Sequence, residues 1–247
     1  MIKAEIYTQS DGKIVAFVIS GHSHVGGPGY DIYCAEISTL SYAARICIKD
    51  YLNRDILMEN YEHGGLGIEL EKAPDELTEA VFQEMLIGLR AVETVAPRVL
   101  QIEFIEMDEA AAENLHNRLK GMSQSQGNTL PDFAVEQVKI RADIYQNAEG
   151  KILGFDVKER KDFEMNQLKI YCAGIWSLAK SAYLCAKDYL KRELEVETDS
   201  GILKIKLKTP PDEVTEAVFQ MMLMGMREIE NLKPEALKIN IGGESNV

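Results

Sequence analysis

Apolar and polar residues alternate along residues 2–9, and this period of two predicts a β-strand; the strand-like apolar run at residues 13–19 predicts a second one. Asp11 and Gly12 lie between the two runs, and an Asp-Gly pair in that position is typical of a hairpin turn. Similar runs predict three more strands, two of them joined by a turn at residues 63–65: residues 56–62, 66–71 and 99–105. The hairpins favour a mostly antiparallel sheet.

Two segments between these strands have the periodicity of amphipathic helices. The first covers residues 35–52, and the second opens at Pro74 and stops at Pro97. Their apolar stripes are formed by Ile37, Leu40, Ala44, Ile48 and Leu52 in the first helix and by Leu77, Val81, Met85, Leu89 and Val92 in the second. The order strand-strand-helix-strand-strand-helix-strand predicts an α+β unit with both helices packed on the sheet.

The sequence of the whole unit is repeated once in the chain. Residues 2–7 return as residues 140–145, and Cys34 returns as Cys172, at a constant offset of 138. The offset becomes 137 after one residue is lost from the second copy. Two complete copies indicate duplication and fusion. The predicted domains are residues 1–105 and 139–242, joined by a linker over residues 106–138.

The linker is predicted to contain one short helix, capped by Asp108 and ended by Gly121. Its polar part, residues 123–132, is expected to be mobile. The tail, residues 242–247, is expected to fray.

Composition narrows the class of protein. The 247 residues carry a formal net charge of −13, which argues against nucleic acid as the main partner. An acidic surface instead favours a basic protein or peptide. The first residues lack the apolar core of a signal peptide, and no run approaches the roughly 20 apolar residues of a membrane helix. We therefore expect a cytoplasmic protein with no membrane partner.

The four cysteines are predicted to be free thiols. None of them belongs to a Cys-x-x-Cys pair. Cys34 and Cys47 lie 13 residues apart on one predicted helix, which separates them by about 20 Å and excludes a disulfide between them. Cys47 and Cys185 fall near the apolar faces of their helices and are expected in the core.

Residues 20–38 carry the candidate chemistry. His22 stands at the end of a predicted strand and Cys34 at the start of the first helix. The loop between strand and helix is rich in glycine: Gly21, Gly26, Gly27, Pro28 and Gly29. A thiol at a helix N-terminus is expected to favour its nucleophilic thiolate form. An imidazole beside it can take the thiol proton and later protonate a leaving group. Backbone N–H groups near Cys34 would form the oxyanion hole.

Other interpretations of these residues stay open. Cys34 alone is equally consistent with a buried structural thiol, and His22, His24, Cys34 and His63 offer ligand types that suit zinc. No second Cys or acidic ligand is obviously placed for it, so we expect neither a metal nor a cofactor.

Three further side chains near the motif have open roles. Asp31 suits either a residue that orients His22 or, as we favour, a helix cap or a contact of the substrate loop. Tyr30 and Tyr33 flank the site and either line a substrate groove or pack. In the second unit Trp176 has no evident partner and is interpreted as a packing residue.

The first unit resembles the ribosomal-processing cysteine proteases of the Prp family. The family motif is Gly-His-small, a glycine-containing loop, and then Asp-x-x-Cys with a Ser four residues later. Its positions here are Gly21, His22, Ser23, Asp31, Cys34 and Ser38. The resemblance implies a thiol endopeptidase with Cys34 as nucleophile and His22 as general base, which removes a short N-terminal extension from a large-subunit ribosomal protein. It also implies homodimers and a loop that orders around the substrate.

The second unit departs from that motif. Glu159 stands in place of Gly21, Arg160 in place of His22, and Lys169 in place of Asp31, whereas Cys172 persists. Arginine cannot serve as a base at neutral pH, so this unit is expected to be catalytically dead. We expect it to replace the second subunit of the family's dimer, which gives an internal pseudo-dimer that is monomeric overall. The alternative function is a non-catalytic binding or scaffolding protein derived from the protease fold.

Overall fold

A computed structural model describes residues 1–26, 31–62, 65–121, 138–161 and 168–243. Several expectations fall outside these ranges: the loop glycines Gly27 and Gly29, the first part of the turn at residues 63–65, the polar linker and the end of the tail. Within the described ranges the chain forms two similar halves, each with one five-stranded sheet and two long helices. No described helix is both long enough and apolar enough to cross a membrane.

The first half has the predicted order of elements. They are β1 (Ile2–Thr8), β2 (Ile14–Ser20), α1 (Ile32–Ile46), β3 (Ile56–Glu62), β4 (Gly65–Leu70), α2 (Glu76–Val95) and β5 (Leu100–Glu106). The strands are arranged β3-β4-β2-β1-β5, with β1 and β5 parallel and every other neighbouring pair antiparallel. The prediction of an α+β fold with a mostly antiparallel sheet is therefore confirmed.

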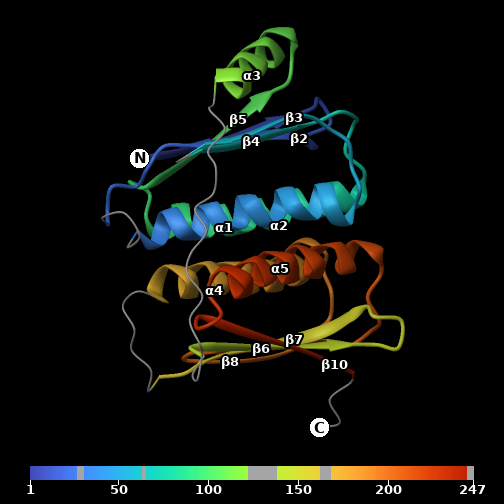
Figure 1. The fold of residues 1–247 in the computed structure, drawn as a ribbon. Coiled ribbons are helices and arrows are strands. Elements are labelled where there is room, and N and C mark those ends of the chain that lie inside the picture. Colours follow the sequence, from blue (N-terminus) through green and yellow to red (C-terminus); the bar gives the residue numbers. More distant parts are fainter. Residues whose placement is uncertain (27–30, 63–64, 122–137, 162–167, 244–247) are drawn as a thin grey trace.

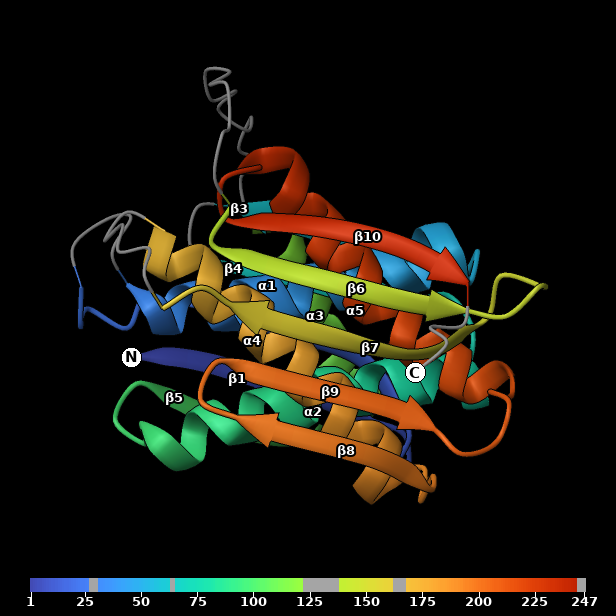
Figure 2. The ribbon, with the colours of Figure 1, turned by 90° about the horizontal axis from the view of Figure 1, so that it is seen from below.

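The second half repeats this arrangement. Its elements are β6 (Ile140–Gln146), β7 (Ile152–Glu159), α4 (Lys169–Leu184), β8 (Leu194–Asp199), β9 (Ile202–Leu207), α5 (Glu213–Leu232) and β10 (Leu237–Gly243). The strand order is β10-β6-β7-β9-β8, and β10 and β6 form the parallel pair. Figure 2 looks onto this sheet.

The first helix begins earlier than its apolar pattern suggested. Asp31 caps α1, which starts at Ile32 rather than at residue 35, so Cys34 lies inside the first turn. The helix continues into one π-helical turn, η1 (Cys47–Tyr51), and α4 continues into the equivalent turn, η3 (Cys185–Tyr189). The second helix is capped by Asp75, the residue after Pro74.

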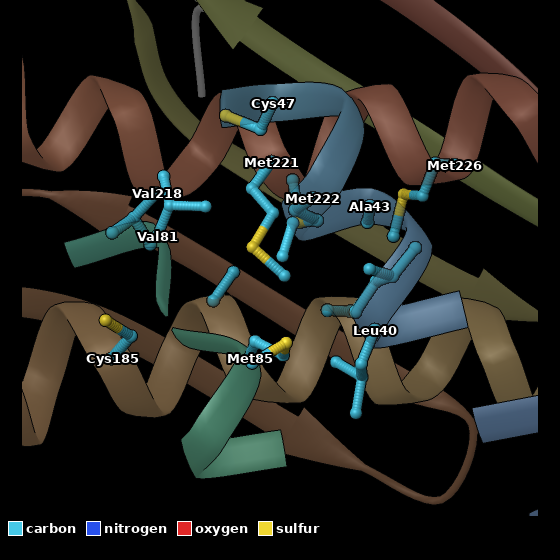
Figure 3. Packing of buried hydrophobic residues seen from close by; sticks show 14 of the residues in the cluster. Leu40, Ala43, Cys47, Val81, Met85, Cys185, Val218, Met221, Met222 and Met226 are labelled. Atoms are coloured by element: carbon cyan, nitrogen blue, oxygen red, sulfur yellow. The ribbon is translucent and has the colours of Figure 1, made fainter. Parts of the chain in front are cut away.

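The four long helices lie together between the two sheets (Figure 1). All five residues of the predicted stripe of α1 are buried, as are four of the five of α2, Leu77 being half-buried. Residues of α1 beside this stripe are buried against the other unit: Ala43 and Cys47 have no exposed surface. One hydrophobic cluster consequently runs through both halves (Figure 3).

The helices of the two units approach closely. A Cβ atom on Gly225 of α5 would lie only 2.8 Å from the Cβ of Ala43, so a larger residue there would push α5 away from α1. Two thiols bridge the units in equivalent ways. The Cys47 Sγ donates to the Ala217 carbonyl oxygen at 3.6 Å, and the Cys185 Sγ donates to that of Ala80 at 3.9 Å.

The helix α3 (Glu109–Gly121) packs on the outer face of the first sheet (Figure 1). Its Leu115 and Leu119 are buried against Tyr7, Val15 and Val18. A Cβ on Gly67 of β4 would lie 2.4 Å from the Leu119 side chain, so a glycine is needed for this approach.

Polar contacts fix α3 to the strands that lead to the candidate site. The Arg118 guanidinium forms an ion pair with the buried carboxylate of Glu5, and it also donates to the Ser20 Oγ at 3.3 Å. The His116 Nε2 lies 2.8 Å from the Glu69 carboxylate. Ser20 ends β2 directly before the motif that contains His22.

Within the described ranges, no helix covers the outer face of the second sheet (Figure 2). Gly67 pairs with Val18 in the first sheet, and the equivalent pair in the second sheet is Lys204 and Asp156. Asp156 is buried there and its carboxylate pairs with the Lys158 ammonium, so this face differs from the apolar face on which α3 packs in the first unit.

Glu84 breaks the symmetry of the helix layer. Its side chain is fully buried, and one carboxyl oxygen accepts a hydrogen bond from the Ser181 hydroxyl of the other unit at 3.3 Å. Burial raises the pKa of Glu84 well above its ordinary value. Met221 occupies the equivalent position in α5 and is buried as well. The interface therefore contains a carboxyl group whose burial favours its protonated form.

This carboxyl group makes the stability of the whole protein depend on pH. In the unfolded chain Glu84 ionises near its ordinary pKa of about 4.3, whereas the folded protein retains the proton. Stability therefore falls as pH rises above that value, by up to about 1.4 kcal/mol per pH unit, until the folded pKa is reached. We predict that Glu84→Gln becomes increasingly more stable than the unmodified protein between pH 5 and pH 8.

Urea unfolding at several pH values measures this difference. Glu76→Gln is the control, since Glu76 lies exposed on the same helix. A difference between Glu84→Gln and the unmodified protein that does not change with pH would contradict the assignment of a buried, protonated Glu84.

Candidate active site

The start of α1 is built around the Asp31 carboxylate. Asp31 has extended backbone angles, and its Oδ1 accepts a hydrogen bond from the Cys34 backbone N–H at 3.0 Å. Its Oδ2 accepts from the Ser23 hydroxyl and, at 3.4 Å, from the Gly26 N–H. Asp31 is therefore the helix cap, one of the two roles that the sequence left open. These hydrogen bonds outweigh the effect of burial and lower the pKa of Asp31.

The Cys34 thiol faces the segment that follows β2. It is half-buried against the core, and its Sγ accepts a hydrogen bond from the Ser23 backbone N–H at 3.5 Å. Ser23 is the residue directly after His22. The fold therefore brings the segment that contains His22 into contact with the Cys34 thiol. Tyr33 packs half-buried against the same core.

The environment of Cys34 differs from the one expected at a helix N-terminus. Burial raises the pKa of the Cys34 thiol, and the Asp31 carboxylate adds to this, while the Ser23 N–H acts in the opposite direction. The expectation of a favoured thiolate is therefore wrong. The main physical reason is that burial disfavours the charged thiolate; the Asp31 carboxylate, which already binds the N–H of Cys34, adds a negative charge at the helix end. A base has to remove the thiol proton at neutral pH.

His22 stands where the chain leaves β2. Gly21 precedes it with a φ of +97°, and a Cβ there would lie 2.7 Å from the Met1 carbonyl oxygen, so only glycine fits. The His22 carbonyl oxygen accepts a hydrogen bond from the Met1 nitrogen at 2.8 Å. The His22 side chain is exposed, and its ring centroid lies 6.0 Å from that of His24.

The remaining predicted residues divide into two groups. Gly26 contacts Asp31 as described, and Ser38 is exposed one turn beyond Cys34 on α1. Gly27, Gly29, Tyr30 and His63 lie outside the described residues. Among the described residues, no group of three or more His, Cys, Asp or Glu side chains is arranged to hold a metal ion.

The sequence reasoning gave no role to Ser23. Its side chain is only 9% exposed, although His22 and His24 on either side are exposed. The signal available in the sequence was a small hydroxyl residue directly after the histidine and eight positions before an aspartate.

The equivalent place in the second unit is filled by other side chains. Trp176, at the position of Ser38, donates its Nε1 proton to Glu159 at 2.8 Å, and Glu159 also pairs with Lys139 at 3.1 Å. Trp176 also packs partly buried against the core, as predicted, but its indole N–H has a partner that the sequence did not reveal. Cys172 is 8% exposed, and burial together with the Glu159 carboxylate raises its pKa to about 11.

Comparison with known proteins identifies the class of the first unit. Residues 1–101 match the family model described as cysteine protease Prp. The first unit is thus similar to this family of cysteine proteases, and the second unit has the same order of helices and strands.

The matching solved structures align with less than half of this chain. The ribosomal processing protease Prp from Staphylococcus aureus, in complex with a covalently linked product peptide, has 22% identity and a TM-score of 0.41, and covers 42% of this chain and 100% of its own. SMU.848 from Streptococcus mutans has 23% identity and a TM-score of 0.38, and covers 43% and 96%. A search of the curated proteins finds no match.

We predict that the four thiols differ in their reaction with iodoacetamide. Only the thiolate reacts, so the rate rises as pH approaches the pKa of each thiol. Cys34 is half-buried with a raised pKa, whereas the pKa of the buried Cys172 is about 11. At pH 8.5 Cys34 should react at least about tenfold faster than Cys172, and the fully buried Cys47 and Cys185 should react slowest.

Peptide mass spectrometry of the alkylated protein follows each thiol separately. Protein unfolded in urea is the control, because there all four thiols should react at similar rates. Equal rates for Cys34 and Cys172 in the folded protein would contradict the difference between their environments.

Proposed function

We propose that the first unit is a cysteine endopeptidase that uses Cys34 as nucleophile and His22 as general base. The observation that carries this proposal is the contact of the Cys34 sulfur with the N–H of Ser23, the residue next to His22. The match of residues 1–101 to the Prp family supports it. In keeping with that family, the substrate is the N-terminal extension of a large-subunit ribosomal protein.

The reaction has two stages. His22 takes the proton of Cys34, and the thiolate attacks the scissile carbonyl carbon of the substrate. The tetrahedral intermediate collapses as His22 gives the proton to the leaving amine, which leaves a thioester on Cys34. Water, activated by His22, then hydrolyses the thioester and restores the thiol. A base is needed because the raised pKa of Cys34 keeps the thiol protonated at neutral pH.

A basic ribosomal substrate suits the charge of the protein, since the chain carries a net charge of −13. We place the protein in the cytoplasm, where such a substrate is made and where free thiols persist. All four cysteines are free in the structure.

We further propose that the second unit is non-catalytic and takes the place of a partner subunit. Arg160 replaces the proposed base, and Trp176, Glu159 and Lys139 interact at the equivalent site. The burial of Cys172 supports this assignment.

The peptidase proposal predicts the behaviour of three variants toward precursors of large-subunit ribosomal proteins from the same cell. Cys34→Ser should abolish cleavage, and His22→Ala should lower kcat by at least about 100-fold because general-base catalysis is lost. Cys172→Ser is the matched control and should cleave normally. Mass spectrometry of the shortened product gives the rate.

The same assay separates catalysis from binding alone. If the unmodified protein binds a precursor without cleaving it, and Cys34→Ser binds equally well, the endopeptidase proposal is wrong and the scaffolding alternative holds. A Cys172→Ser variant that loses activity would place the chemistry in the other unit.

The proposed internal pseudo-dimer predicts a monomer in solution. Light scattering after size-exclusion chromatography should give a mass near the 27.7 kDa of one chain. A dimer in which the two first units contact each other would contradict the proposal, and cross-linking between their α1 helices would detect it.

A further inference from the structure

Ser23 connects the two parts of the candidate site. Its backbone N–H donates to the Cys34 Sγ at 3.5 Å, and its hydroxyl donates to the Asp31 Oδ2. The same hydroxyl oxygen accepts a hydrogen bond from the Val25 N–H at 3.1 Å. One small residue thus contacts the thiol, the cap of its helix and the turn that follows His22.

We propose that Ser23 is a positioning residue, whose hydroxyl holds its own backbone N–H on the Cys34 sulfur and so sets His22 against the thiol. This inference rests on the proposed function of the site. The backbone N–H is present in every residue except proline, but it needs an anchor to stay in place. Asp31 provides that anchor, because its Oδ1 is fixed by the Cys34 N–H while its Oδ2 accepts the Ser23 proton.

The hydroxyl also limits the effect of Asp31 on the thiol. The Asp31 charge raises the pKa of Cys34. A proton donor on Oδ2 spreads that charge and keeps the carboxylate bound to Ser23. Without the hydroxyl, Oδ2 retains only the Gly26 N–H at 3.4 Å, and the Ser23 N–H loses its anchor. Both changes make the thiolate harder to form.

The second unit provides a natural comparison. Lys161 stands at the position of Ser23, and Lys169 stands at the position of Asp31. The residue before α4 is Leu168, whose side chain makes no capping hydrogen bond. Neither member of the Ser23–Asp31 pair is therefore present there.

The experiment measures the alkylation rate of Cys34 by iodoacetamide between pH 6 and pH 11, together with kcat and KM for cleavage. For Ser23→Ala we expect the rate curve of Cys34 to move up by about one pH unit, which is a roughly tenfold slower reaction at a fixed pH below its midpoint. The value of kcat should fall with little change in KM. Ser23→Thr retains the hydroxyl and should restore both within about twofold.

Lys161→Ala, at the equivalent position of the second unit, is the matched control and should leave the Cys34 curve unchanged. An unchanged curve in a folded Ser23→Ala protein, or a Ser23→Thr protein as impaired as Ser23→Ala, would overturn the proposal. The alkylation rate can be measured whether or not the protein cleaves a substrate. If Ser23→Ala shifts the alkylation curve of Cys34 but the unmodified protein cleaves no precursor, the role of Ser23 is supported and the proposed function is refuted.

A second variant addresses the case in which Ser23→Ala does not fold. Asp31→Asn retains an oxygen that can cap α1, and its amide nitrogen can donate to the Ser23 Oγ, so the link to Ser23 stays while the charge that acts on the thiol is removed. Its Cys34 curve should move to lower pH, opposite to Ser23→Ala. A curve that stays in place would mean that Asp31 does not act on Cys34, and the proposal would fail.

Discussion

The close contact between the helix layers of the two units is the constraint on which the structure depends. The helices α1 and α2 are buried on one side by their own sheet and on the other by α4 and α5 (Figure 1). A first unit alone would expose Ala43 and Cys47 to water, a penalty that grows with the apolar area. Small residues such as Gly225 make the contact close enough to exclude water. The helix that carries Cys34 is thus held by packing from both units.

Fusion of the two units allows the interface to be asymmetric. Cys47 and Cys185 retain equivalent hydrogen bonds to the facing helices. Glu84 and Met221 occupy equivalent positions, yet only Glu84 has a hydroxyl partner, Ser181, since the equivalent residue in the first unit is Ala43. A second copy of the first unit, docked in the same way, would place each Glu84 carboxyl group against a methyl group. Burying a polar group without a partner is costly, so the first unit is fitted to this particular second unit.

Local patterns predicted the elements of this fold because each depends on residues near in sequence. The apolar run at residues 13–19 is the buried strand β2, and the stripes of α1 and α2 correspond to buried faces of the structure. The start of α1 was misplaced by three residues because the Asp31 cap precedes the first residue of the apolar stripe. The contacts of Ala43 with α5 and of Trp176 with Glu159 depend on tertiary packing, which no local pattern reports. The same holds for the role of Ser23, whose partners lie eight and eleven residues away.

A comparison of the two equivalent cysteines shows which properties of the thiol depend on its helix and which depend on the segment before that helix. Cys34 and Cys172 stand at the same place in two helices of the same fold, and both pack against the core. A cysteine that persists without a base at its side is explained by packing, since a buried thiol behaves as a small apolar group. Reactivity therefore has to come from the segment between the second strand and the helix. In the first unit that segment supplies Gly21, His22, Ser23 and Asp31, whereas in the second it supplies Glu159, which pairs with Trp176 and raises the pKa of the thiol further. The chemical difference between the units thus follows from one connecting segment, while the scaffold stays the same.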